Sequence, residues 1–257
     1  MSNVKINKKR VEQSFRKSIS TYNQHATVQN DICEKLINEL IKHCGNSFNQ
    51  IFEFGAGTGL LTDKIVKKLN VKKLFLNDLV SLMKTPLSTI CDSNLNLKTT
   101  YVMGDAESLD IIPNNDLIIS ASTVQWFDNL KEYISANILQ GLNSNGIFAF
   151  STFGPQNMIE IGSIEGNSLQ YLTITELENI LATHFDILSI NEEFIPLFFK
   201  TPKDVLNHIK QTGVNGIESK KWTKIDLLQF TNSYEIFNSD KGYILTYHPI
   251  SVICRKK

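Results

Sequence analysis

The feature that most constrains the fold of this chain is a glycine-rich turn placed directly between a short strand and a helix. Residues 50–54 read Gln-Ile-Phe-Glu-Phe, a strand candidate, and residues 55–59 read Gly-Ala-Gly-Thr-Gly. Leu61, Ile65 and Leu69 then recur at helical spacing. Glycines here allow a tight backbone turn and a close ligand approach where a Cβ would collide. The segment therefore predicts a strand–turn–helix unit, and ligand binding is favoured over a turn that serves packing alone.

The spacing of the glycines distinguishes this turn from the common phosphate-binding loops. Relative to the dinucleotide fingerprint G-x-G-x-x-G, the third glycine (Gly59) comes one place early, and Leu60 holds the fingerprint position. No Lys-Ser/Thr pair follows, so the segment is not a P-loop. The spacing fits a loop that passes beside a nucleoside with a sulfonium tail, and Glu53 places a carboxylate near such a cationic ligand.

Short apolar runs alternate with segments of helical spacing after the glycine turn. Strands are expected at 73–77, 99–103, 116–120 and 147–151, and helices at 80–91 and 130–142. Pro86 is expected to kink or divide the first of these helices. The almost continuous apolar run at 116–120 is typical of a strand buried on both faces. The alternation predicts an α/β fold with right-handed crossovers and a parallel sheet covered by helices on both faces.

The two ends of the chain add further elements. Residues 8–42 have helical spacing, with a break expected at 23–25. A capping box from Thr175 to Glu178 is expected to open a helix that runs to His184. The remaining expected elements are helices at 202–210 (after Thr201) and 225–237, and strands at 185–194 and 243–254, the last interrupted by Pro249.

Two more acidic residues follow the next two predicted strands. Asp78 stands about twenty residues after the glycine turn, where a carboxylate accepts hydrogen bonds from both ribose hydroxyls of a bound nucleoside. Asp105, in the sequence Gly-Asp-Ala-Glu, is placed to accept from an adenine amine. Taken singly, Asp78 is equally compatible with a helix cap or an NAD enzyme, and Asp105 with an ordinary turn. Three signals at successive strand ends are more specific, because ligands of open α/β sheets bind at those ends.

Composition excludes several classes of protein. The 26 basic residues balance the 26 acidic residues, which argues against general nucleic-acid binding. No apolar stretch approaches the length of a membrane-spanning helix, and the first ten residues lack the apolar core of a secretion signal. The four cysteines form no C-x-x-C pair and no metal-ligand spacing. We therefore expect a cytoplasmic protein with reduced thiols and no bound metal.

Together, these motifs resemble the class I S-adenosylmethionine-dependent methyltransferases: E-x-G-x-G-x-G, then Asp78, the tract 104–107 and the strand 116–120. Four further segments resemble, more specifically, the malonyl-acyl-carrier-protein O-methyltransferase family of biotin synthesis, so that the likeness covers nearly the whole chain. They are Phe15-x6-Tyr22-x3-Ala26-x2-Gln29, Ser122-Thr123-Val124-Gln125-Trp126, residues 209–216 (Ile-Lys-Gln-Thr-Gly-Val-Asn-Gly) and Leu245-Thr246-Tyr247-His248.

The resemblance implies a Rossmann-like class I methyltransferase fold, with a mostly parallel seven-stranded sheet and an N-terminal helical lid. It implies one domain over 1–257, made of a helical cap (1–45), a cofactor-binding half (48–153) and a substrate half (154–257) with a helical insertion at about 200–240. The implied activity is methyl transfer from S-adenosylmethionine to the free carboxylate of a malonyl thioester on acyl carrier protein or coenzyme A. The product is a methyl ester that begins pimeloyl and biotin synthesis.

Site residues follow from these motifs. The expected cofactor-binding residues are Glu53, Gly55, Ala56, Gly57, Gly59, Asn77, Asp78, Asp105, Ala106 and Ser120. The expected substrate contacts are Tyr22, His25, Gln125, Trp126, Lys210 and His248, each of which has a packing or solvent-exposed alternative. Asn77 departs from the family, where many relatives carry an apolar residue. No catalytic base is expected, because a carboxylate with a pKa around 4 is already ionised near pH 7.

The N-terminal helices and residues 200–240 are expected to form a lid. Basic residues on these elements are expected to steer an acidic carrier protein: Lys8, Lys9, Arg10, Arg16, Lys17, Lys220, Lys221 and Lys224. Arginine is scarce, so a bidentate arginine clamp on the substrate is less expected. A monomer is expected.

The sequence leaves three alternative functions open. They are a methyltransferase of another small carboxylate or hydroxyl substrate, a non-catalytic cofactor-binding protein, and an NAD-dependent oxidoreductase.

Overall fold

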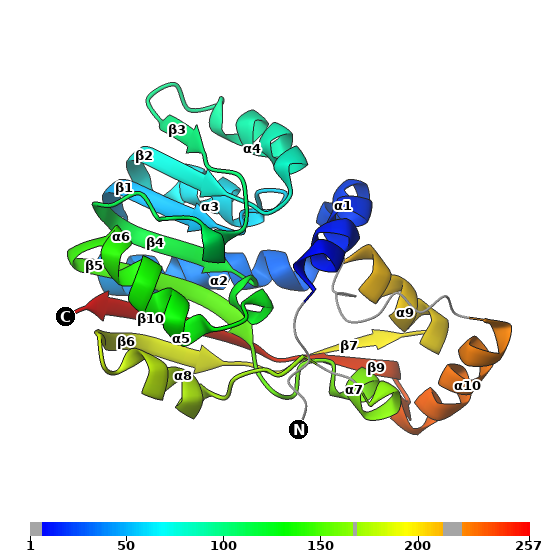
Figure 1. The fold of residues 1–257 in the computed structure, drawn as a ribbon. Helices are drawn as coiled ribbons and strands as arrows, with labels where there is room; N and C mark the ends of the chain where they lie inside the picture. Colours follow the sequence, from blue (N-terminus) through cyan, green and yellow to red (C-terminus); the bar gives the residue numbers. More distant parts are fainter. Residues whose placement is uncertain (1–6, 167–168, 213–222) are drawn as a thin grey trace.

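The chain folds around a mixed sheet whose strand order is β3-β2-β1-β4-β5-β10-β6 (Figure 1). The computed structural model describes residues 7–166, 169–212 and 223–257. The strands are β1 (Ser47–Phe54), β2 (Asn70–Asn77), β3 (Lys98–Tyr101), β4 (Asn115–Ala121), β5 (Leu142–Phe153), β6 (Phe185–Glu192) and β10 (Pro249–Lys256). Pairs among the first five strands are parallel, and β10 is antiparallel to both of its neighbours. The predicted mostly parallel, seven-stranded sheet is confirmed.

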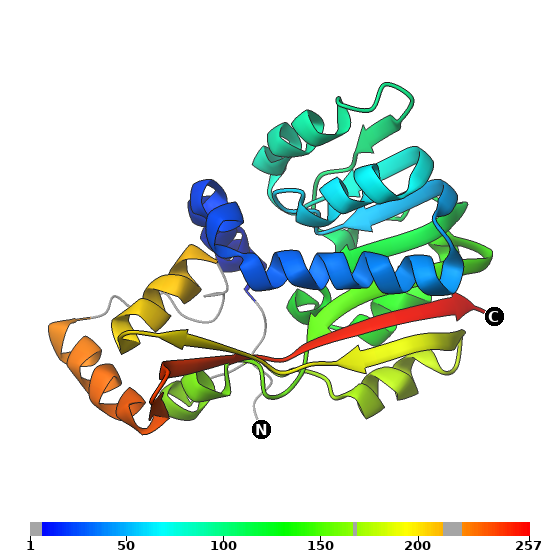
Figure 2. The same ribbon diagram turned by 180° about the vertical axis from the view of Figure 1, so that it is seen from behind.

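Helices cover both faces of this sheet, as predicted. The helices are α1 (Lys8–His25), α2 (Thr27–Cys44), α3 (Leu60–Lys68), α4 (Lys84–Cys91), α5 (Leu130–Tyr133), α6 (Leu139–Gly141), α7 (Ile159–Glu165), α8 (Ile174–Leu181), α9 (Pro202–Gln211) and α10 (Lys224–Tyr234). Figure 2 shows α2 running across one face beside α3, whereas α5, α6 and α8 lie on the other face in Figure 1. No helix in the described part of the chain is both long and apolar enough to cross a bilayer.

The two faces are buried by alternate residues of the same strands. In β4, Leu117 and Ile119 pack in the apolar cluster that contains α2, whereas Ile118 packs in the cluster that contains α8. All three side chains are fully buried. A strand with two buried faces has no need of polar alternation, which explains the continuous apolar run that predicted it.

The strand order places the reversal of chain direction at β1. The chain adds β2 and β3 outward on one side of β1 and then crosses to β4 and β5 on the other side. The carboxyl ends of β1, β2 and β4 therefore lie together at one edge, with Phe54 in register with Asn77. Ligands of doubly wound sheets bind at such a switch point.

A second, three-stranded antiparallel sheet was not predicted. It contains β7 (Ile195–Phe199), β9 (Gly242–Tyr247) and β8 (Asn238–Ser239) in that order. The single strand predicted at 243–254 is wrong, because β9 belongs to this small sheet and β10 to the large one. The chain passes from one sheet to the other at His248 and Pro249 (Figure 1). A third apolar cluster joins α9, α10 and the small sheet to the start of α2.

Several predicted helix boundaries need correction. The break in the N-terminal helical segment falls at Ala26, just after the predicted 23–25. Pro86 lies in the first turn of α4, where its missing N–H leaves no helical bond unmade. The helix is divided before it, after a 3₁₀ turn, η1 (Ser81–Met83).

The capping box of α8 is formed by Thr173 and Glu176, two residues earlier than predicted. The Thr173 Oγ1 accepts from the Glu176 N–H, and Glu176 accepts from the Thr173 N–H. Hydrogen bonds from the backbone and side chain of Thr173 hold the pKa of Glu176 below its ordinary value. Thr175, the predicted cap, lies inside the helix and is exposed.

The corrected cap predicts different effects for two neighbouring threonines. Thr173→Ala should lower the free energy of unfolding by about 1 kcal/mol, because it leaves the Glu176 N–H without its cap. Thr175→Ala should be neutral or slightly stabilising, since alanine is the better helix former. Urea unfolding of the two variants checks this, and equal losses would contradict the assigned cap.

Candidate active site

The three turns that carry the predicted cofactor motifs are hydrogen-bonded to one another. The Ala56 N–H donates to the Asn77 carbonyl at 2.9 Å, and the Gly104 N–H donates to the Asp78 carbonyl at 2.9 Å. The Asn77 side chain donates to the carbonyls of Val102 (2.7 Å) and Gly104 (2.9 Å). Asn77, which departs from the family, therefore ties the end of β2 to the turn after β3.

Asp78 is held in place by backbone N–H groups. Its Oδ2 accepts from the Gly57 N–H and its Oδ1 from the Val80 N–H, both at 2.8 Å. Burial raises the pKa of Asp78 to about 6, and the two backbone hydrogen bonds offset part of that increase. Each carboxylate oxygen keeps a lone pair, so the group can still accept from a ligand's hydroxyls.

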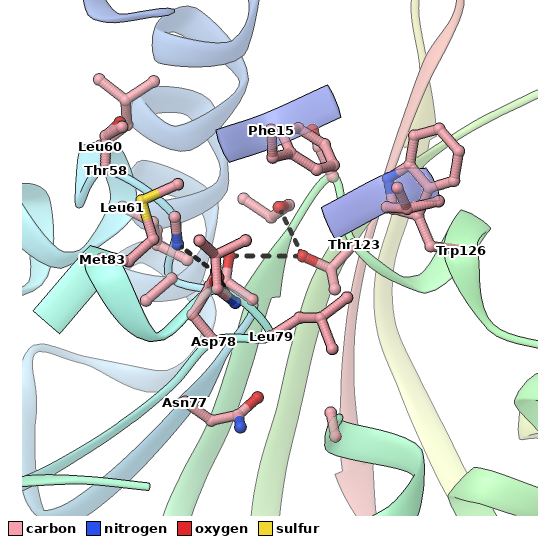
Figure 3. Close-up of a pocket in the computed structure, with 18 of the residues that line it drawn as sticks. Phe15, Thr58, Leu60, Leu61, Asn77, Asp78, Leu79, Met83, Thr123 and Trp126 are labelled. Atoms are coloured by element: carbon pink, nitrogen blue, oxygen red, sulfur yellow. Dashed lines mark hydrogen bonds between the residues drawn. The ribbon is translucent and has the colours of Figure 1, made fainter. Parts of the chain in front are cut away.

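One pocket opens at this edge of the sheet, and most of the predicted cofactor residues line it (Figure 3). They are Gly55, Ala56, Gly57, Asn77, Asp78, Asp105 and Ala106. Gly59, Ser120 and Glu53 are not among the lining residues. Gly59 begins α3 at φ +92°, where a Cβ would meet Ile90, and the Ser120 hydroxyl donates to the Phe54 carbonyl at 2.7 Å.

Glu53 lies behind the glycine turn in the protein interior. One of its oxygens accepts from the Thr62 hydroxyl at 2.8 Å, and the other has no partner among the described residues. Burial raises the pKa of Glu53 to about 8, and the nearby Asp78 adds to the increase. At neutral pH the carboxyl is therefore mostly uncharged in the protein alone. Its predicted role as a countercharge for a cationic ligand stays a prediction.

Helix α1 closes the pocket from above. Val11, Phe15, Ile19 and Tyr22 recur on one face of α1, and all four line the pocket. Figure 3 shows Phe15 beside Trp126, with their ring centroids 6.0 Å apart and their planes perpendicular. Burial raises the pKa of the Tyr22 phenol above its ordinary value.

Both ends of α1 are bound to the rim of the site. At its start, the Lys8 ammonium pairs with Asp105 at 2.7 Å and with Glu107. Burial lowers the pKa of Lys8, but the hydrogen bonds to these two carboxylates outweigh it and raise the value. At the other end, the Thr58 hydroxyl of the glycine turn donates to Asn23. Lys8 is thus part of the site and not of an open docking face; Lys220 and Lys221 lie outside the described residues.

The predicted lid at 200–240 does not reach this pocket. None of its described residues lines the cavity. Helix α9 instead packs beside α1, and the Thr21 hydroxyl donates to the Gln211 carbonyl at 3.4 Å. The described part of this segment therefore packs against α1 on the side away from the pocket.

Among the expected substrate contacts, Tyr22 and Trp126 line the pocket, and His25, Gln125, Lys210 and His248 do not. Both ring nitrogens of His248 are engaged: one pairs with Glu192 at 2.7 Å, and the other accepts from the Gln156 N–H at 3.1 Å. The Gln125 amide donates to the Ser122 carbonyl at 2.6 Å. Lys210 is exposed on α9.

Two further lining residues belong to the family-like segments of the sequence but were not among the expected site residues. Gln29 and Ser122 both face the pocket, and Ser122 has a left-handed backbone at φ +53°. Neither burial nor a positive φ at a serine is visible in a single sequence, so these two residues were not singled out.

The pocket fits S-adenosylmethionine. A Cβ built on Gly57 meets nothing within 4 Å, so the glycine leaves open space on the pocket wall for a ligand. Asp78 and Asp105 bring two carboxylates to the pocket wall, and the apolar face of α1 covers the pocket. Their predicted roles toward ribose and adenine stay predictions.

Solved structures with the same fold include methyltransferases. A putative methyltransferase from Bacillus halodurans C-125 aligns with a TM-score of 0.62 at 15% identity, covering 87% of this chain and 97% of that one. The N-methyltransferase NodS from Bradyrhizobium japonicum WM9, in complex with S-adenosyl-L-homocysteine, aligns at 0.58 and 11% identity, covering 96% and 98%. The chain therefore has the class I methyltransferase fold.

Sequence comparison is more specific, although no family model matches the chain. The malonyl-[acyl-carrier protein] O-methyltransferase of Bacteroides thetaiotaomicron is 41% identical, over 98% of this chain and 99% of its own length. The enzyme of the same name from Calditerrivibrio nitroreducens is 36% identical, over 95% of each chain. The chain belongs to the malonyl-[acyl-carrier protein] O-methyltransferase family, and the resemblance noted from the motifs is confirmed.

A matched pair of glycines tests the position of the cofactor. Gly57 and Gly45 both have positive φ (+56° and +77°), and a Cβ on either meets nothing within 4 Å. Gly57→Ala should cost about 1–2 kcal/mol of stability. Gly45→Ala should cost about 1–3 kcal/mol, because the ψ of −172° at Gly45 belongs to a region that is essentially restricted to glycine. Only Gly57→Ala should weaken S-adenosylhomocysteine binding, by at least about tenfold, which calorimetry would measure. Unchanged affinity in Gly57→Ala would place the ligand elsewhere.

The raised pKa of Asp78 predicts a pH-dependent affinity. Below pH 6 its carboxyl takes up a proton and loses acceptor capacity, so S-adenosylhomocysteine should bind up to about tenfold more weakly per pH unit. Asp78→Asn should bind weakly at all pH values and show a flatter profile. A wild-type affinity that stays constant from pH 8 to pH 5 would contradict the assignment.

Proposed function

We propose that this protein transfers a methyl group from S-adenosylmethionine to the free carboxylate of a malonyl thioester carried on acyl carrier protein. Family membership at up to 41% identity over nearly the full length carries the proposal. A pocket at the switch point of the sheet, closed by α1, supports it. In this proposal, residues 48–153 hold the cofactor and residues 1–45 close the site. Residues 154–257, none of whose described members lines the pocket, receive the part of the carrier-bound substrate that lies outside it.

The residues that would hold the cofactor are those on the three tied turns. Asp78 accepts from the ribose hydroxyls, Asp105 accepts from the adenine amine, and Gly57 leaves space for the chain between nucleoside and amino-acid tail. Lys8 already pairs with Asp105, so cofactor entry requires this ion pair to open or to share the carboxylate. When bound, S-adenosylmethionine supplies an electrophilic methyl group on a positively charged sulfur.

The protein's contribution to the reaction is positioning and exclusion of water. The substrate carboxylate is ionised without help, so no side chain is needed as a base. Holding an oxygen in line with the methyl group contributes roughly 7–11 kcal/mol to lowering the barrier. Phe15, Trp126 and Phe127 form an aromatic part of the lining that keeps the reacting groups dry once α1 is closed.

The choice of carrier and the cellular setting are part of the same proposal. The carrier-bound thioester is the proposed substrate, with the coenzyme A thioester as the alternative, and the enzyme is proposed to act as a monomer in the cytoplasm. All four cysteines are free thiols, three of them buried, which suits a reducing compartment.

Mass spectrometry of carrier protein tests the function. After incubation with enzyme and S-adenosylmethionine, malonyl-carrier should gain one methyl group that mild base removes, and acetyl-carrier, which has no free carboxylate, should gain none. Asp78→Asn should lower the rate at sub-saturating cofactor. Absence of the methyl ester on malonyl-carrier, or faster methylation of another carboxylate under the same conditions, would overturn the proposal.

A further inference from the structure

Three residues that line the pocket each carry a buried polar side-chain atom without a hydrogen-bond partner. The atoms are Gln29 Oε1, Ser122 Oγ and Trp126 Nε1, three of the five such atoms found in the described part of the chain. A buried polar atom without a partner costs about 1–3 kcal/mol. Three of them around one cavity therefore indicate a ligand that provides the missing partners.

Ser122 combines this missing partner with an unfavourable backbone. Its φ of +53° is a conformation that side-chain-bearing residues rarely adopt, with a cost of order 1 kcal/mol. The position is fixed by its own N–H, which donates to the Ser151 carbonyl at 3.0 Å. The backbone thus holds Ser122, which lines the pocket, directly after the carboxyl end of β4.

The charges around the pocket limit how a carboxylate can be bound. Lys8 is the one cationic side chain among the described lining residues, and Asp105 and Glu107 already neutralise it. None of the three arginines of the chain lines the pocket. A buried carboxylate must therefore rely on neutral donors and on any positive charge that arrives with the cofactor.

Ser122 and Trp126 are suitable neutral donors. The indole N–H can only donate, and Trp126 is 7% exposed. The serine hydroxyl donates one hydrogen bond. The two residues lie on the same short segment, at the end of β4 and on the 3₁₀ turn η3 (Val124–Trp126), so their spacing is fixed locally. Gln29 Oε1 is an acceptor and does not suit a carboxylate.

We propose that the Ser122 hydroxyl and the Trp126 indole N–H together hold the free carboxylate of the substrate, and that the cofactor's positive sulfur is the only charge opposing it. The inference rests on the proposed function and names the residues that recognise its substrate. It assigns substrate specificity to two uncharged donors instead of an arginine or lysine clamp.

This arrangement suits a reaction in which both charges disappear. The carboxylate oxygen forms a bond to the methyl carbon, the carbon–sulfur bond breaks, and its electron pair remains on a now neutral sulfur. An arginine clamp would then be left buried without its anion, which is costly. The Ser122 and Trp126 donors keep a partner in the ester carbonyl, so the site matches both the charged substrate and the neutral product.

A binding experiment tests the charge argument without turnover. Calorimetry would compare the affinity of malonyl-pantetheine for enzyme saturated with sinefungin, whose protonated amine replaces the methylated sulfur, or with the neutral S-adenosylhomocysteine. Malonyl-pantetheine should bind at least tenfold more tightly with sinefungin, and acetyl-pantetheine should show no such difference. Equal affinities of malonyl-pantetheine in the two complexes would overturn the proposal.

Two substitutions test the residues themselves. Ser122→Gly removes the hydroxyl and relieves the positive φ, so its melting temperature should equal or exceed that of the wild type. Trp126→Phe keeps an aromatic ring against Phe15 and removes the N–H. Each should raise the KM for malonyl-carrier at least tenfold and leave the Kd for S-adenosylhomocysteine unchanged.

The outcomes separate this inference from the proposed function. A wild-type enzyme that methylates malonyl-carrier, with both variants retaining its KM, would refute the carboxylate site and leave the function standing. A wild-type enzyme that does not methylate malonyl-carrier would refute both.

Discussion

The site depends on one interaction, in which the buried carboxylate of Asp78 accepts the N–H groups of Gly57 and Val80. This interaction fixes the glycine turn against the end of β2, although the same burial raises the Asp78 pKa to about 6. The backbone hydrogen bonds of Ala56 and Gly104 extend the tie to all three turns. The switch in strand order at β1 brings these turns to one edge, and a nucleoside site follows.

Helix α1 turns this open edge into a partly enclosed pocket. Its apolar face covers the cavity, and the ion pair of Lys8 with Asp105 and Glu107 holds its start against the rim. Exclusion of water favours the reaction, because a carboxylate that loses its hydration is a more reactive nucleophile. The same ion pair uses the one cationic lining side chain in the described residues, which leaves substrate recognition to neutral groups.

The large sheet and the cofactor turns were predictable because their signals are local. A buried strand, a glycine turn and an acidic residue at each strand end are readable in sequence, and so is the helical stripe of α1 from Val11 to Tyr22. The small sheet was missed because β7 and β9 pair across more than forty residues, and no local pattern reveals which sheet a strand joins. The hydrogen bonds of His248 could not be predicted for a related reason: its partners, Glu192 and Gln156, are distant in sequence.

The most direct test of the account is a crystal structure of the protein with S-adenosylhomocysteine. The ribose should lie against Asp78, the adenine beside Asp105, and the sulfur should face Trp126 beneath Phe15 of α1. A ligand bound away from the glycine turn, or three turns that separate in the complex, would contradict the central claim that this tied edge of the sheet is the methyl-transfer site.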